Sequence, residues 1–223
     1  MTALQGDSAT RVLSVPETPQ QFHARALAAT DEQRRLTFGE IPYWEVFPFE
    51  AEGLRVKPLE DLTLPEPPRH GEGGVDCSAC AHAEHAAADE VWRSERWRVV
   101  LQGPGGSPLM LVAQPLAHHD LADLPDELAA EMGVLLVHLT RAMESLPQVG
   151  RVHVAKWGDG GAHLHLFVYA RPKGMMQLRG TMMAVWDDFL PPVPVEVRDA
   201  DARTVIRALT LSLGGRALGV AAG

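Results

Sequence analysis

The sequence has little cysteine, few aromatic residues and no long hydrophobic run. Only two of its 223 residues are cysteines, which excludes a disulfide-stabilised scaffold. Its most apolar stretch, 132–139, contains His138 and is far shorter than a membrane span requires, so no membrane partner is expected. The first seven residues have neither a basic start nor an apolar segment, so we expect no secretory signal and a cytoplasmic protein.

Basic residues are also in the minority. There are 20 Lys and Arg against 29 Asp and Glu, a formal charge of −9. A chain with this charge is not expected to bind nucleic acid through its backbone phosphates. The hydrophobic fraction, by contrast, is 46%, which excludes disorder across the whole chain and is enough for one sizeable core.

The composition changes along the chain and divides it into three parts. Residues 63–75 hold three prolines and three glycines, which is typical of a linker or a covering loop. We therefore predict an N-terminal extension and linker over 1–75, a core domain over 76–174 and a C-terminal helical extension over 175–223.

Periodicity predicts an α+β fold with an antiparallel sheet and flanking helices. Strands 97–102 and 109–114 are joined by a short Pro/Gly turn and should form a hairpin. Apolar residues at three- and four-residue steps predict a long helix over 125–146, and two more strands follow it. The other expected segments are strands at 151–157 and 163–170, helices at 19–36, within 175–190 and at 200–213, a short helical turn within 77–89, and an irregular segment at 41–49.

Two histidines lie at alternate positions of the strand 163–170. Because side chains alternate between faces, His163 and His165 should share the face that also carries Phe167. The turn Gly158-Asp159-Gly160-Gly161 precedes them, and its backbone amides are suited to binding an anion. An isolated His-x-His is more often a solvated or hydrogen-bonded structural pair, so the pattern alone does not identify a site.

The pair Cys77 and Cys80 has the spacing of zinc ligands. Zn²⁺ in proteins takes four nitrogen or sulfur ligands in a tetrahedron, so two histidines would complete the set. Two rival explanations remain open. A redox Cys-x-x-Cys normally follows a strand in a βαβ unit, and two free cysteines can also simply be buried. The candidate histidines are His118, His119 and His163 from distant parts of the chain, and His82 and His85 nearby.

An ordered set of motifs covers residues 77–172. It consists of a Cys-x-x-Cys, a strand hairpin followed by Pro-x-x-His, an amphipathic helix with an acidic start, a glycine-rich turn, alternating histidines and an arginine. In this chain the motifs are Cys77-Ser-Ala-Cys80, Pro115-Leu-Ala-His118, Pro125-Asp-Glu-Leu128, Gly158-Asp-Gly-Gly161, His163-Leu-His-Leu-Phe167 and Arg171-Pro172. In this order the sequence resembles the histidine triad superfamily and, in its metal ligands, the galactose-1-phosphate uridylyltransferase branch of that superfamily.

The resemblance implies a fold, a metal site and an activity. A structural Zn²⁺ would be held by two cysteines, the histidine after the hairpin and the first histidine of the strand motif. The corresponding residues are Cys77, Cys80, His118 and His163, with His119 adjacent to His118 and the choice between them open. The middle histidine, His165, would be the nucleophile that forms a covalent nucleotidyl-histidine.

The remaining site residues also follow from the resemblance. The amides of Gly158, Asp159, Gly160 and Gly161 would hold phosphate oxygens, and Trp157 would stack on a base. Lys156 and Arg171 are charge partners for the phosphate, or solvated surface charges. The expected ligand is a nucleotide or sugar nucleotide, and because family members are often twofold dimers the resemblance implies a homodimer.

Two departures from the family pattern weaken the activity that it implies. The third histidine of the triad is replaced by Phe167, which cannot donate a hydrogen bond to a phosphate. The turn before the motif lacks the Gln, Ser or Thr that many members have there, and Asp159 would repel a phosphate unless it turns away. The predicted function is therefore a nucleotidyl transferase or nucleotide phosphoester hydrolase, and the alternative is a non-catalytic nucleotide-binding or protein-interaction module.

Overall fold

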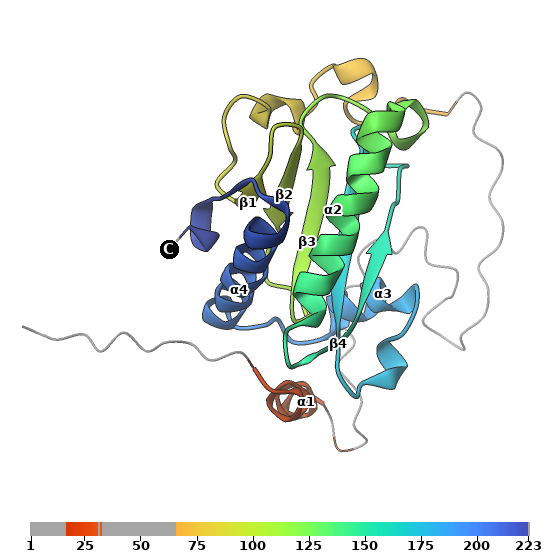
Figure 1. Cartoon of the computed structure of the whole chain (residues 1–223). Coiled ribbons are helices and arrows are strands. Elements are labelled where there is room, and N and C mark those ends of the chain that lie inside the picture. Colours follow the sequence, from red (N-terminus) through yellow and green to blue (C-terminus); the bar gives the residue numbers. More distant parts are fainter. Residues whose placement is uncertain (1–16, 31, 33–65, 223) are drawn as a thin grey trace, which may run out of the picture.

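The computed structural model describes residues 17–30, 32 and 66–222, and the expected irregular segment at 41–49 lies outside them. Six strands form one antiparallel sheet in the order β4-β5-β3-β2-β1-β6 (Figure 1). The predicted α+β class with an antiparallel sheet is confirmed. The strands are β1 (Glu90–Arg93), β2 (Trp97–Leu101), β3 (Met110–Pro115), β4 (Val149–Ala155), β5 (Leu166–Pro172) and β6 (Arg216–Ala217), and the helices are α1 (Pro19–Ala28), α2 (Asp126–Glu144), α3 (Met182–Phe189) and α4 (Val195–Leu213).

Helices α2 and α4 cover one face of the sheet, side by side (Figure 1). Helix α2 begins with Asp126 and Glu127, whose charges favour a helix N-terminus, and it buries Leu135 and Leu139 at a four-residue step. On the strand side the alternate residues Leu166 and Val168 of β5 point into the same core. Among the described residues no helix is long and apolar enough to cross a membrane.

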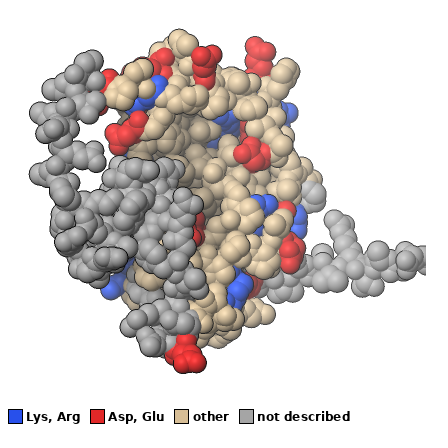
Figure 2. Space-filling model, turned by 180° about the vertical axis from the view of Figure 1, so that it is seen from behind, with Lys and Arg blue, Asp and Glu red and all other residues tan. Residues whose placement is uncertain are grey.

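A second, smaller core lies on the opposite face of the sheet. Tyr169 of β5 alternates with the residues of the main core and packs there with Phe22 of α1 and Met183 of α3. Helix α1 begins with a capping box in which the side chains and backbone amides of Thr18 and Gln21 bond reciprocally. Figure 2 views the molecule from this side, where residues other than Lys, Arg, Asp and Glu make up most of the visible described surface and the charged residues are scattered.

Several elements differ from their expected bounds. Strand β5 begins at Leu166 rather than at residue 163, because the amide of Leu164 donates to the carbonyl of His119, outside the sheet (2.6 Å). The predicted shared face for the two histidines is therefore wrong. Strands β1 and β6 were not predicted. Residues 195–213 form one helix, which begins five residues earlier than expected. Its Ile206 packs in the main core against the sheet.

Candidate zinc and nucleophile site

Two cysteines and two histidines from three separate segments meet at one end of the sheet. Cys77 and Cys80 lie in the segment before β1, His118 follows β3, and His163 precedes β5. One ligand atom from each residue lies within 4.8 Å of all the others. The set is the one that the family resemblance implied, with His118 rather than His119.

The separations fit a single tetrahedral ion. The Sγ atom of Cys80 lies 3.4 Å from Nδ1 of His118 and 3.5 Å from Nδ1 of His163, and Sγ of Cys77 lies 3.6 Å from Nδ1 of His163. A zinc ion with its usual bond lengths and tetrahedral angles would place sulfur and nitrogen ligands about 3.5 Å apart. The donor set and the spacing therefore suit Zn²⁺ with four protein ligands and no open position.

Protonation in the cluster also suits a metal. Nε2 of His163 lies 2.9 Å from the carbonyl oxygen of Pro115, which can only accept, so Nε2 carries the hydrogen and Nδ1 is left with a lone pair. Burial lowers the pKa of His163 and keeps the ring neutral. Burial, followed by the adjacent Cys77 thiol, raises the pKa of Cys80 to about 11, so the thiolate form that binds a metal needs a nearby cation.

The other candidate histidines have different surroundings. Nδ1 of His119 lies 3.6 Å from Oδ1 of Asp123, and His82 and His85 are exposed. Sequence reasoning missed Arg98 of β2, which is buried beside the cluster and donates to the carbonyl of Ala79 between the two cysteines (3.0 Å). An arginine in a predicted strand carries no signal that it will face a metal cluster.

His165 is placed next to the glycine-rich turn. Its Nδ1 lies 2.8 Å from the carbonyl oxygen of His163, so Nδ1 carries the hydrogen and Nε2 keeps its lone pair. The side chain is partly exposed, and a Cβ atom added at Gly161 would lie 3.7 Å from its Cε1. An imidazole whose Nδ1 is bonded to a carbonyl and whose Nε2 remains available beside a backbone turn is the arrangement a nucleophilic histidine requires.

The glycine turn is held by a segment that sequence reasoning took for a linker or covering loop. The amide of His70 donates to the carbonyl of Gly160 (3.1 Å), and the amide of Ala162 donates back to His70 (2.9 Å). Arg69 donates to the carbonyl of Gly158 (3.0 Å). Within the part of the chain that the structure describes, no acceptor is bonded to the four amides of 158–161, so they remain available to an anion.

An ion-pair network supports the same turn. Asp120 accepts from Arg69 (2.5 Å) and from Nζ of Lys156 (3.1 Å). Lys156 is therefore held in place by its ion pair with Asp120. Asp159 is exposed in the turn. The Arg69–Asp120 pair joins residues 51 apart in sequence, and nothing in the composition around either residue signals it.

Phe167 adjoins His165 and is itself in contact with two more aromatic rings, those of Trp157 and Tyr169. Phe167 lies perpendicular to the His165 ring (5.4 Å between centroids), and Trp157 packs against Phe167 (5.3 Å) and Tyr169 (6.2 Å). Trp157 is 45% exposed, so part of its ring surface is open. Phe167 thus serves as packing between the histidine and the smaller core, which explains an apolar residue at this position.

Arg171 lies away from this group. It is the sixth residue after His165 on a nearly extended chain, about 20 Å along it by the rise of a strand. Its guanidinium donates to carbonyls near its own end of β5. Of the predicted site residues, Gly161 of the turn lies beside His165, Lys156 lies against Gly158, and Trp157 is joined to His165 through Phe167, whereas Arg171 is not part of this group.

Comparisons with known proteins return histidine triad structures. No protein-family model matches the sequence, and no curated protein matches it significantly. A Zn-bound histidine triad family protein from Mycobacterium smegmatis is similar over 60% of this chain and 94% of its own, with 22% identity and a TM-score of 0.46. A histidine triad protein from Marinobacter aquaeolei has 23% identity over 56% of this chain and 92% of its own (TM-score 0.44), and a uridylyltransferase has 19% identity over 61% and 46% (TM-score 0.43).

Proposed function

We propose that the protein is a nucleotidyl transferase or nucleotide phosphoester hydrolase that acts through a covalent nucleotidyl-histidine at His165. The observation that carries this proposal is the hydrogen bond between Nδ1 of His165 and the carbonyl of His163. It leaves Nε2 as the ring nitrogen available to a substrate, in a partly exposed residue beside a turn whose four amides have no acceptor among the described residues. The histidine triad and uridylyltransferase names of the similar solved structures point to the same class of chemistry.

The zinc ion is proposed to be structural. Cys77, Cys80, His118 and His163 would supply all four ligands, so the ion would contribute a crosslink between distant segments and no reaction centre. Because His163 is both a ligand and the hydrogen-bond acceptor of His165, the cluster fixes the peptide that orients the nucleophile.

The reaction proceeds in two displacements at phosphorus. Nε2 of His165 attacks the α-phosphorus of a nucleotide or sugar nucleotide, a phosphorus–nitrogen bond forms, and the bond to the leaving phosphate or alcohol oxygen breaks with its electron pair. The turn amides at Asp159 and Gly160 hold the oxygens on which charge builds. Water or an acceptor phosphate then attacks phosphorus and releases His165. Trp157 offers a ring face for the base.

Covalent labelling tests the proposal directly. The full chain, purified with zinc, is incubated with α-³²P-labelled ATP and UTP, and the protein is separated under alkaline conditions that preserve a phosphorus–nitrogen bond. We expect label that acid removes and that His165→Ala abolishes. His138→Ala is the matched control, because His138 lies on α2 and bonds Ser212 instead (2.9 Å). No label in the parent protein, or equal label in His165→Ala, would refute the proposed enzymatic mechanism.

A second candidate, a nucleotide-binding module without turnover, is favoured by Phe167. That residue packs on Trp157 and offers no hydrogen bond to a phosphate. The module predicts that a nucleotide raises the melting temperature of the parent protein while no label forms. If the nucleotide neither labels the protein nor raises its melting temperature, both candidate functions are wrong.

A further inference from the structure

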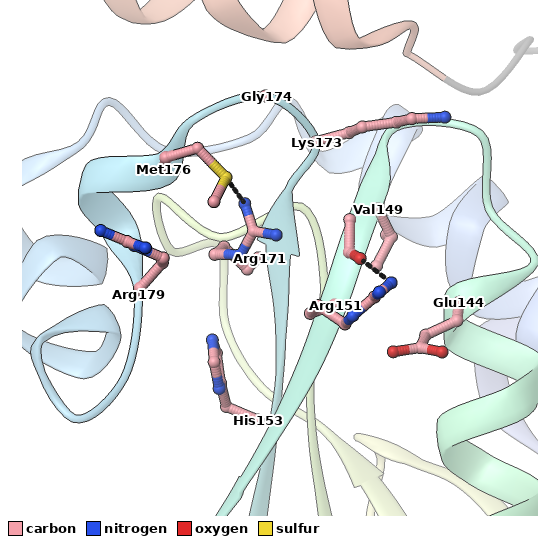
Figure 3. A pocket seen from close by; sticks show the side chains of 10 residues that line it. Glu144, Val149, Arg151, His153, Arg171, Lys173, Gly174, Met176 and Arg179 are labelled. Atoms are coloured by element: carbon pink, nitrogen blue, oxygen red, sulfur yellow. Dashed lines mark hydrogen bonds between the residues drawn. The ribbon is translucent and has the colours of Figure 1, made fainter.

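A second pocket lies at the opposite end of the β4–β5 hairpin from the zinc cluster. Its volume is about 650 Å³, within the range of pockets that hold small-molecule ligands. Figure 3 shows Arg171, Arg179 and His153 to one side of β4 and Arg151 with Glu144 to the other. The charged and titratable side chains that line it are Glu144, Arg151, His153, Arg171, Lys173 and Arg179.

The central cation of this pocket is buried without a counter-ion. Arg171 is 6% exposed, and its Nη1 donates to the carbonyls of Pro172 (2.9 Å) and Met175 (3.4 Å). A Cβ atom at Gly150 would lie 2.8 Å from its Nη2, so glycine leaves the space that the guanidinium occupies against β4. Buried charges in proteins are normally paired, because an isolated one is costly.

The surrounding charges do not neutralise Arg171. Over residues 66–222, none of Arg151, Arg171, Lys173 and Arg179 forms an ion pair with a carboxylate. Arg151, Arg171 and Arg179 line the same pocket. Burial lowers the pKa of Arg171, and the positive charges of Arg151 and Arg179 lower it further. The one acid in the lining, Glu144, accepts from the amide of Val152 (3.3 Å) instead.

The histidine of the pocket carries an unused polar atom. Nε2 of His153 is buried, and no described residue forms a hydrogen bond with it. Burial and then the charge of Arg171 lower the pKa of His153, so the ring is neutral and contributes a dipole instead of a fifth charge. An imidazole nitrogen without a hydrogen-bond partner and a buried guanidinium without a carboxylate, both judged over the described residues, are the features of a site built for a ligand.

We propose that this pocket binds the phosphate group of a small phosphorylated molecule, at a site separate from His165. Phosphate fits better than a single carboxylate because three further cations line the pocket with the buried guanidinium of Arg171, and a phosphate brings two negative charges and several acceptor oxygens. The remaining volume accommodates the organic part of the molecule, and Glu144 offers a free carboxylate oxygen to a hydroxyl or amine. The pocket does not require that His165 be active.

Calorimetric titration of the full chain with inorganic phosphate, pyrophosphate and AMP tests the site. We expect binding of at least one probe, and Arg151→Ala and Arg179→Ala should each weaken it about tenfold, the value of one charge-assisted hydrogen bond. Both residues are exposed, so these variants should fold. Arg207→Ala removes the same charge from an exposed position of α4 and should change the affinity less than twofold.

A comparison with His165→Ala separates the two sites. Binding that survives in His165→Ala and falls in the arginine variants supports the pocket. Tighter binding of AMP than of inorganic phosphate would identify a nucleotide as the source of the phosphate group, and equal binding would identify the phosphate group alone. The proposal is overturned if no probe binds, if Arg207→Ala weakens binding as much as the pocket variants, or if only His165→Ala loses it.

Discussion

The Nδ1 atom of His165 lies 2.8 Å from the carbonyl oxygen of His163, while the imidazole of His163 itself points Nδ1 toward the two cysteine sulfurs. Two histidines two residues apart therefore hold opposite tautomers, each fixed by a backbone carbonyl. One presents Nδ1 to a metal position and the other keeps Nε2 free beside the glycine turn. His163 thus belongs to the zinc cluster through its side chain and orients the proposed nucleophile, His165, through its backbone carbonyl.

Zinc binding should depend on Cys80. We expect about one zinc per chain in the parent protein and little in Cys80→Ser, because serine replaces a thiolate by a poor zinc ligand. The loss of a crosslink among three segments should cost on the order of 3 kcal/mol, or about 10 °C in Tm for a chain of this size. Metal analysis and scanning calorimetry measure both. His82→Ala, which alters an exposed histidine two residues away, should retain the metal.

Asp120 should anchor the segment 66–76 to the glycine turn. Asp120→Asn removes the charge that Arg69 and Lys156 share, and we expect a loss of about 1 to 2 kcal/mol of stability with faster amide exchange at His70 and Ala162. Hydrogen exchange read by mass spectrometry gives the local effect. Asp159→Asn removes an equal charge from an exposed turn position and should leave exchange at His70 unchanged. Equal exchange in both variants would contradict the anchoring role.

Periodic and closely spaced features were predictable from the sequence. The helix α2 and the hairpin β2–β3 follow directly from apolar spacing and turn residues. The Cys-x-x-Cys spacing limited the metal ligands to a few histidines, but the choice of His118 over His119 depends on which ring turns inward, and sequence order carries no information on that.

Features that depend on long-range contacts were not predictable. Strand β6 has only two residues and is a strand only because these residues pair with Trp92 and Arg93 of β1. The start of β5 at Leu166 is set by a hydrogen bond of Leu164 to His119 in a different segment. The cluster of Arg151, Arg171 and Arg179 combines two strands and a loop, and each arginine taken alone looks like a surface charge.

Gly215 should be intolerant of a side chain. Its φ of +78° is in the left-handed region, and a Cβ atom there would lie 2.6 Å from the indole ring of Trp92. Gly215→Ala should therefore cost backbone strain of about 1 kcal/mol and, in addition, displace a buried tryptophan, for a total of about 3 kcal/mol. Gly180→Ala is the control, since Gly180 also has a positive φ (+67°) but nothing within 4 Å, and it should lose only the first part. Urea unfolding of the two variants measures the difference.

Stability should fall as the pH rises from about 4 to 7, and Asp201 should be a main cause. Asp201 is fully buried; its Oδ2 accepts from Nε2 of Gln148 (2.6 Å), while Oδ1 has no partner among the described residues. Burial raises the pKa of Asp201 to about 7, only partly offset by that hydrogen bond.

The sign of the effect follows from proton binding. Between the unfolded pKa of about 4 and the folded value, the native state binds the proton that the unfolded chain has released, so the free energy of unfolding decreases with pH. Asp201→Asn keeps the acceptor for Gln148 and removes the titration. It should therefore be more stable than the parent at pH 8, by on the order of 2 to 4 kcal/mol, and similar to it near pH 4.

Asp187 also contributes to the pH dependence of stability, because its pKa lies in the same range. Its carboxylate accepts from the amide of Ser107 (2.6 Å), yet burial raises its pKa to about 6. Asp201→Asn should accordingly flatten the decline of stability above pH 6 and leave a smaller decline between pH 4 and 6. Urea unfolding of parent and variant from pH 4 to 8 resolves the two steps. If the two curves run parallel over that whole range, Asp201 is ionised in the folded protein and the buried carboxylate has a counter-charge that compensates its burial.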